Sequence, residues 1–136
     1  MLLFVLNFTY NFFIGQYGKC WHSQALASRL VTGLQLNWEA HPEDQRHFIQ
    51  REINRRLVWQ IFTNDRHLAS GFEEYVLLHE EHIKLRLPCS DEAFRDNKPV
   101  IMERLTDVPP TKPSGGYFSI CAYYLRLMNI RHHILA

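Results

Sequence analysis

The clearest pattern in the chain is a helical repeat of apolar residues from about Gln45 to Ala69. Its apolar row contains Ile49, Ile53, Leu57 and Ile61, with Val58, Phe62 and Ala69 widening the stripe. A stripe of this width is typical of a helix that packs one face against a core. Gly71 follows as a stop signal. The spacing therefore predicts a long helix that carries many charged residues on its other positions.

The segment Met1–Ile14 is strongly apolar. It lacks the basic start and small-residue cleavage site of a signal peptide. A membrane span needs about 20 apolar residues, whereas Asn7, Thr9 and Asn11 interrupt this run and Gly15 ends it. A buried helix is the favoured interpretation, and a cleaved or anchoring segment is the alternative.

Two further segments have helical spacing. From Trp21 to Leu36, Leu26, Leu30 and Leu34 form one row, with Ala27 and Val31 beside it. From Tyr117 to Leu135 the chain is nearly all apolar, which predicts a helix buried on most sides. The first of these patterns predicts a core stripe made of leucines.

The stretch from Phe72 to Leu87 is ambiguous. Tyr75–Leu78 could begin a short helix, while Ile83, Leu85 and Leu87 alternate with polar residues as in an extended segment. Pro88 favours extended backbone before it. Ser90 is placed to cap a short helix. The polar stretches 37–45 and 107–116 are expected to be loops.

Composition places the chain among folded proteins. Its 136 residues are 46% hydrophobic, which is too apolar for a disordered tail. The length suits one domain. The sequence predicts an all-α, irregular multi-helix domain. Because it starts in an apolar helix and ends at Ala136 without a following Gly or Pro, we expect an incomplete piece of a larger helical domain.

The charge is nearly balanced. Fifteen Lys and Arg stand against fourteen Asp and Glu, for a net charge of +1. This excludes a broad electrostatic footprint for nucleic acid or an anionic membrane. The basic cluster Arg51, Arg55 and Arg56 could contact phosphates, but Glu52 and Asp65 nearly balance it. An internal ion-pair network on a mostly buried helix is favoured.

Residues for metal or covalent chemistry have the wrong spacing. Cys20, Cys89 and Cys121 contain no C-x-x-C pair, which fits buried, inert thiols in a reducing compartment. The run His79–His82 reads H-E-E-H, one residue short of the H-E-x-x-H of helical zinc proteases. His132 and His133 are adjacent and point apart on a helix. We therefore predict no catalytic, cofactor-binding or metal-binding residues and no enzyme activity.

Three blocks of the chain carry a resemblance to a known family. The central block runs from Glu52 to Arg66, and its pattern is an acidic residue, arginines, a tryptophan, then Phe and Asp-Arg. The block before it spans 21–36, and the block after it spans 83–94 and contains Leu87-Pro88. In order and spacing they resemble the fungal-specific transcription factor domain, the middle homology region of zinc binuclear-cluster regulators. Val58 stands in place of the first tryptophan of the family's pair, and Asn54 interrupts the arginine run.

The resemblance implies a helical regulatory domain of a nuclear transcription factor, acting on transcription by RNA polymerase II. It places the whole chain, 1–136, in this domain, with the signature region at about 21–94. It also implies that zinc and direct DNA binding belong to a segment absent from this chain. The implied partners are other parts of a parent factor, with a homodimer formed through that parent, or the transcription machinery. The signature positions, expected to be structural, are Glu52, Arg55, Arg56, Trp59, Phe62, Asp65, Arg66, Leu87 and Pro88.

Two other functions remain open at this stage. One is a helical protein-interaction module without a DNA-binding parent. The other is a small metalloenzyme that uses His79 and His82. The effector ligand and the target genes stay unspecified.

Overall fold

The computed structural model describes residues 1–39, 47–109 and 119–136, and these form an all-α domain as predicted. The α-helices are α1 (Leu2–Phe13), α2 (Tyr17–Gly33), α3 (Phe48–Ala69), α4 (Asp91–Arg95) and α5 (Ile120–Leu135). Two short 3₁₀ helices, η1 (Glu73–Tyr75) and η2 (Glu80–His82), lie between α3 and α4. Within the described ranges, the sole β-type pairing is an isolated bridge between Arg86 and Arg104.

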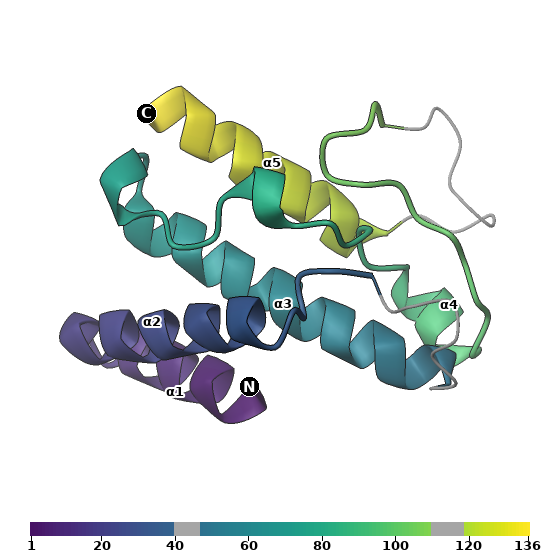
Figure 1. The fold of residues 1–136 in the computed structure, drawn as a ribbon, viewed down its shortest axis with the longest axis horizontal. Helices are drawn as coiled ribbons and strands as arrows, with labels where there is room; N and C mark the ends of the chain where they lie inside the picture. Colours follow the sequence, from purple (N-terminus) through teal and green to yellow (C-terminus); the bar gives the residue numbers. More distant parts are fainter. Residues whose placement is uncertain (40–46, 110–118) are drawn as a thin grey trace.

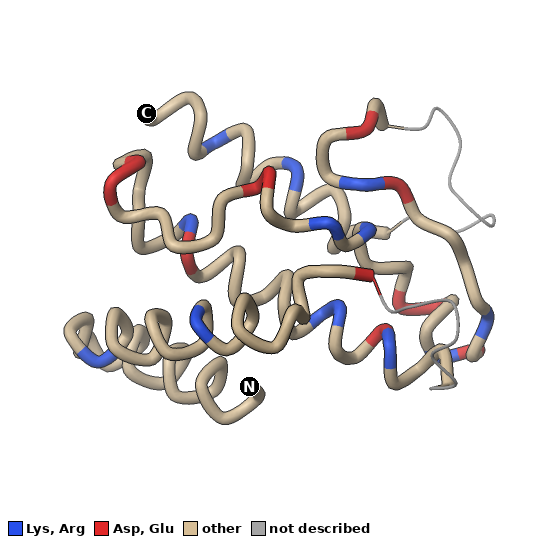
Figure 2. The backbone as a smooth tube through the Cα atoms, viewed as in Figure 1, with Lys and Arg blue, Asp and Glu red and all other residues tan. Residues whose placement is uncertain are grey.

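Helix α3 lies in the middle of the fold (Figure 1). On one side of it, α1 and α2 form an antiparallel hairpin; on the other lie α5 and the segment that follows α3. Gly15 turns the chain between α1 and α2 with a φ of +75°, a value that glycine adopts without steric cost. Helix α1 carries no charged residue, whereas α3 carries both signs along its length (Figure 2).

The end of α3 differs slightly from the expected stop at Gly71. Ser70, with a φ of 49°, takes the left-handed position that ends the helix. Gly71 follows with a φ of +94°, and a Cβ placed there would lie 2.5 Å from the Cβ of Leu135. Gly71 therefore allows the C-terminal end of α5 to approach the end of α3.

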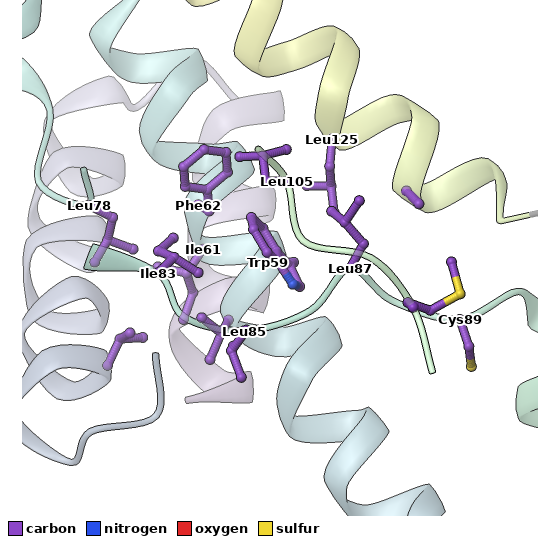
Figure 3. Packing of buried hydrophobic residues seen from close by; sticks show 14 of the residues in the cluster. Trp59, Ile61, Phe62, Leu78, Ile83, Leu85, Leu87, Cys89, Leu105 and Leu125 are labelled. Atoms are coloured by element: carbon purple, nitrogen blue, oxygen red, sulfur yellow. The ribbon is translucent and has the colours of Figure 1, made fainter. Parts of the chain in front are cut away.

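Apart from the 3₁₀ helices η1 and η2, the segment between α3 and α4 is not helical. Of the two possibilities left open for this stretch, the helix that would begin at Tyr75–Leu78 does not form. Ile83, Leu85 and Leu87 are buried in the core beside Trp59 (Figure 3). The alternation predicted here is confirmed, and so is the cap, because the Ser90 hydroxyl accepts the amide of Ala93 at 3.2 Å.

The leucine row predicted for the core-facing side of α2 lies largely on its exposed side. Leu26 is 43% exposed and Leu34 is 62% exposed. The buried face consists of Cys20, Ser23, Gln24, Ala27, Ser28 and Val31. This face packs against α1 and α3, and it consists mostly of small or polar side chains instead of leucines.

The two terminal helices are less buried than their composition predicts. In α1, Val5, Phe8 and Asn11 are buried, whereas Leu3 is 73% and Phe13 is 82% exposed. In α5 the buried residues are Ala122, Leu125, Met128 and His132. The predictions of a buried α1 and of an α5 covered on most sides were therefore wrong.

The boundaries of α5 and of the loops can be compared only in part. Helix α5 begins at Ile120, where the Ser119 hydroxyl accepts the amide of Ala122. Residues 117–118, and the parts of the predicted loops at 40–45 and 110–116, lie outside the described residues. No helix in the described ranges is long and apolar enough to cross a membrane.

Candidate functional site

The signature positions come together along the face of α3 that packs against residues 77–91. Glu52, near the start of this face, is fully buried. Its Oε2 accepts Nη1 of Arg55 at 2.5 Å, and its Oε1 accepts Nε of Arg56 at 3.2 Å. The backbone amide of Cys89 donates to the same Oε1 at 3.0 Å. The predicted internal ion-pair network is confirmed for Glu52, Arg55 and Arg56, and it also holds the backbone of a distant segment.

Arg55 and Arg56 each bind two carboxylates. Arg55 also contacts Glu39 at 3.0 Å, and Arg56 contacts Asp91 at 2.7 Å. Arg56 further donates to the carbonyl of Cys89 at 2.9 Å. Burial alone would lower the pKa of the Arg55 guanidinium, but the charges of Glu39 and Glu52 raise it. Both guanidinium groups are therefore engaged by carboxylates within the chain.

Trp59 occupies the centre of the site. It is 1% exposed, and its indole N–H donates to the carbonyl of Arg86 at 2.8 Å. Its ring meets that of Phe62 edge to face at a centroid distance of 5.3 Å. The burial predicted for Trp59 is confirmed, and the indole N–H has the partner that a buried donor requires.

Asp65 and Arg66 hold the other end of the extended segment. The carboxylate of Asp65 accepts the amides of Leu77 and Leu78 at 3.1 Å and 3.0 Å, and Nη1 of Arg66 at 3.2 Å. Burial raises the pKa of Asp65 and lowers that of Arg66. The Arg66 guanidinium also lies 4.3 Å from the ring centroid of Phe62.

These contacts show that α3 and the segment 77–91 run antiparallel to each other. Glu52 binds Cys89, Trp59 binds Arg86, and Asp65 binds Leu77 and Leu78. Seven residues of helix rise about 10 Å, and three extended residues also span about 10 Å, so the first two contacts match in length. Between Leu78 and Arg86 the segment has more residues than the step from Trp59 to Asp65 requires, and the 3₁₀ helix η2 lies among these residues. Side chains of α3 thus supply the hydrogen bonds that a neighbouring strand would give this backbone.

Leu87 and Pro88 lie where this backbone enters the core. Both are fully buried. The amide of Leu87 donates to the carbonyl of Glu103 at 2.8 Å, and the carbonyl of Pro88 accepts the hydroxyl of Ser119 at 2.7 Å. The segment is therefore bound by α3 on one side and by the chain leading into α5 on the other.

The cysteines have little nucleophilic character. Burial, and then the charge of Glu52, raise the pKa of Cys89 to about 11, so its thiol stays protonated at neutral pH. Cys20 is also buried, and burial raises its pKa. Cys121 is exposed, which corrects the prediction that all three thiols are buried.

The H-E-E-H run does not form a helical metal motif. Glu80–His82 is a 3₁₀ turn, and the rings of His79 and His82 lie 5.8 Å apart, edge to face. In the described part of the chain, no group of three or more His, Cys, Asp or Glu side chains could hold a metal ion.

Several residues that build the site were missed by the sequence interpretation. Glu39 binds Arg55 and accepts the amide of Arg86 at 2.6 Å. The buried Gln24 donates to the carbonyl of Ile61 at 2.9 Å. Arg126 donates to the carbonyl of Leu105 at 3.0 Å and to that of Asp107 at 2.7 Å. Ser119, which binds the carbonyl of Pro88, was missed as well. It is the one of these residues with a local signal in the sequence, because a serine directly before an apolar helix is typical of an N-cap.

Comparison with known proteins agrees with this arrangement. The family model of the fungal specific transcription factor domain matches residues 1–135. A Zn(2)-C6 fungal-type transcription factor, FTF1c, of Fusarium oxysporum f. sp. lycopersici is 31% identical over 73% of this chain and 12% of its own length. The pyrimidine pathway regulatory protein 1 of Saccharomyces cerevisiae is 29% identical over 78% of the chain and 12% of its own length.

A shorter match, 34% identical, covers 57% of the chain and 9% of an uncharacterized transcriptional regulatory protein of Schizosaccharomyces pombe. The chain thus spans about an eighth or less of the length of these relatives. No solved structure matches it. With a family match over nearly its whole length, the chain belongs to the fungal specific transcription factor domain family.

Proposed function

We propose that this chain is a regulatory domain that modulates transcription by RNA polymerase II in a fungal nucleus, by contacting other helices of a transcription factor. The DNA-binding zinc segment of that factor lies outside this chain. In this proposal the signature residues of α3 are structural, and the contacts to partners are made by the outer faces of α1 and α5. The family match supports the regulatory role.

The observation that carries the proposal is a seam of exposed apolar residues on α5. Ile120, Leu127 and Ile134 follow at intervals of seven residues and are 83%, 61% and 77% exposed. Ile130, 54% exposed, lies between the last two. Apolar residues at such heptad spacing are the pattern by which one helix packs along another. We name Ile120, Leu127, Ile130 and Ile134 the α5 seam.

Helix α1 repeats this arrangement on its outer face. Leu3, Leu6, Tyr10 and Phe13 alternate at steps of three and four residues and are 58% to 82% exposed. A continuous apolar face of this kind marks a protein-protein contact. Because the relatives are about eight times longer than the matched region, we propose that helices of the same transcription factor occupy both faces.

A transcription reporter tests this function. The 136-residue chain is tethered to a bacterial operator-binding domain in cells of the fungus that encodes it, so that the transcription factor that supplies the partner helices is also present. Transcription from a promoter with that operator is then measured. We expect the tethered chain to change reporter transcription relative to the operator-binding domain alone. Replacing Leu127 and Ile130 with Ser should abolish the change, because it interrupts the α5 seam without touching the core.

Cys121→Ser is the matched control, because Cys121 is exposed on the same helix outside the seam. This variant should act like the parent chain. A tethered chain without effect on the reporter, or a seam variant with full effect, would contradict the proposal.

The isolated chain is expected not to bind DNA. Its net charge is +1, and Arg55 and Arg56 are held by carboxylates. DNA affinity depends on cationic groups that can replace counterions on phosphates. A salt-dependent mobility shift of DNA at sub-micromolar chain concentration would show that this chain itself binds DNA.

A further inference from the structure

Three exposed aromatic side chains meet where the start of α2 lies beside η1. Trp21 of α2 contacts Tyr75 of η1, with a centroid distance of 5.7 Å and an angle of 76° between the rings. Tyr75 also contacts Phe72, at 5.7 Å and 53°. Trp21, Tyr75 and Phe72 are 36%, 51% and 60% exposed. Both elements lie at the same end of the fold (Figure 1). We name Trp21, Phe72 and Tyr75 the aromatic corner.

The turn that carries Phe72 and Tyr75 is fixed by hydrogen bonds. The amide of Tyr75 donates to the carbonyl of Phe72 at 3.1 Å, and the amide of Leu77 donates to the carboxylate of Asp65 at 3.1 Å. Side chains three residues apart in a 3₁₀ turn lie on the same side of it. On the other side of the corner, Trp21 is held by the regular helix α2. The rings are therefore presented in a preformed arrangement, which lowers the entropic cost of binding.

The angle between the rings suits a cation. Where two rings meet nearly at right angles, one small group can contact the faces of both. Aromatic faces attract cations, and the face of tryptophan does so most strongly. In the described part of the chain, the cation–π contacts are those of Arg56 with Phe94 at 4.6 Å and of Arg66 with Phe62 at 4.3 Å, so no Lys or Arg there lies over a ring of the aromatic corner.

Two carboxylates add charge complementarity. Glu73 and Glu74 stand between Phe72 and Tyr75 in the sequence, and both are exposed. Glu73 contacts His132 at 3.1 Å, whereas Glu74 forms no ion pair with a described residue. Since both carboxylates belong to the same turn as Tyr75, they lie within about the Debye length of 10 Å at 0.1 M salt from a cation bound at the rings, and they attract it.

Arginine is the side chain that meets both requirements. Its guanidinium is planar, always charged and weakly hydrated, and it stacks on aromatic faces and pairs with carboxylates. Lys19 leaves α2 about 200° around the helix from Trp21, so it points away from the corner. We propose that the aromatic corner and the carboxylates beside it bind an arginine-bearing segment of a partner protein. The corner contains no residue of the α5 seam or of the outer face of α1, so this inference goes beyond the function proposed above.

The probe is the pentapeptide acetyl-Gly-Arg-Gly-Arg-Gly-amide, which has no apolar side chain that could bind the α5 seam. It is titrated into the ¹⁵N-labelled 136-residue chain and followed by NMR. We expect saturable shifts at the Trp21 indole N–H and at the backbone amides of residues 72–75. The same peptide with citrulline in place of arginine keeps the shape without the charge and should bind about tenfold more weakly. The lysine peptide should bind about threefold more weakly.

Substitutions at the corner test which side chains recognise the peptide. Trp21→Ala should weaken binding of the arginine peptide about tenfold, while Trp21→Phe, which keeps a ring face, should stay within about threefold of the parent. Trp38→Ala is the matched control, because Trp38 is 60% exposed and lies outside the corner, and it should bind like the parent. Glu74→Gln should weaken binding about threefold. Its control is Glu92→Gln, an exposed position on α4, which should have no effect.

The comparison of the three peptides uses the parent chain, so it does not depend on how well a variant folds. Absence of saturable shifts at the corner, or unchanged binding by Trp21→Ala, would overturn the proposal. Equal affinity for the citrulline peptide would overturn it as well, because the corner would then bind without regard to charge. Equal affinity for the lysine peptide would show that the corner does not select a guanidinium, and would also contradict the proposal.

Discussion

Helix α3 and the terminal helices reverse the usual relation between hydropathy and burial. In α3 the charged residues Glu52, Asp65 and Arg66 are at most 3% exposed. In α1 and α5 large apolar side chains such as Phe13 and Ile120 are more than 80% exposed. Figure 2 shows where the charged residues lie: both signs occur along the central helix, and none occurs on α1.

The difference follows from where the hydrogen-bond partners are. Part of the segment 77–91 lies in the core, and among the described residues its one β-type partner is the bridge between Arg86 and Arg104, so the backbone groups that face α3 need other partners. Glu52, Trp59 and Asp65 supply these partners. The cost of burying their polar groups is offset because each group has hydrogen-bond partners. The outer faces of α1 and α5 carry exposed apolar side chains, and we propose that apolar faces of other helices cover them.

The largest effect is expected for Trp59→Ala. It removes the largest fully buried side chain and the donor to the carbonyl of Arg86. The expected loss in the free energy of unfolding is about 3 to 5 kcal/mol, measured by thermal or urea denaturation. Trp59→Phe, which keeps an aromatic ring but not the donor, should recover much of that loss. A Trp59→Ala chain that melts like the parent would place Trp59 on a binding surface instead.

Glu52→Gln should have the next largest effect. It keeps the shape of the side chain but leaves Arg55 and Arg56 with one less charged partner at a buried position. The expected cost is about 2 to 3 kcal/mol in urea denaturation. Asp96→Asn, at an exposed pair with Arg95, is the control and should cost less than about 0.5 kcal/mol. Equal effects of the two substitutions would show that the Glu52 network adds nothing beyond a surface ion pair.

The pH dependence of stability should show the environment of Cys89. Its pKa is about 11 when folded, against 9.0 ordinarily, so between these values the folded chain keeps a proton that the unfolded chain has lost. Stability is therefore complete below pH 9 and falls as pH rises toward 11, by up to about 1.4 kcal/mol per pH unit from this group. Comparison of Cys89→Ala with the parent isolates this contribution from other groups that titrate there. Parallel stability curves of the two chains across this range would contradict the assigned pKa.

The smallest effect is expected on the α5 seam. Leu127→Ala should change the stability of the isolated chain by no more than about 0.5 kcal/mol, because the side chain is mostly exposed. Leu125→Ala, two residues away and 1% exposed, should cost about 2 to 5 kcal/mol. A strongly destabilising Leu127→Ala would mean that the seam is already covered within this chain.

The sequence predicted α3 to within a few residues, the extended stretch at Ile83–Leu87 and the cap at Ser90, since each has a local signal. It assigned α2 the wrong inner face: Ser23, Gln24 and Ala27 face inward, and the partner of Gln24, the carbonyl of Ile61, lies on another helix. When a helix has apolar residues on both faces, as α5 does, the periodicity of the sequence does not indicate which face packs against the core. The role of Glu39 could not be predicted, because its partners Arg55 and Arg86 are distant in the sequence.

Native-state hydrogen exchange of the 136-residue chain tests most directly whether α3 holds the extended segment. The amides of Leu77, Leu78 and Cys89 donate to side chains of Asp65 and Glu52. We predict that they exchange as slowly as the amides of Trp59 and Phe62 in the middle of α3, because both sets open only when the core opens. If these three amides exchange much faster than those of Trp59 and Phe62, the α3 side chains do not hold this segment, and the account is wrong.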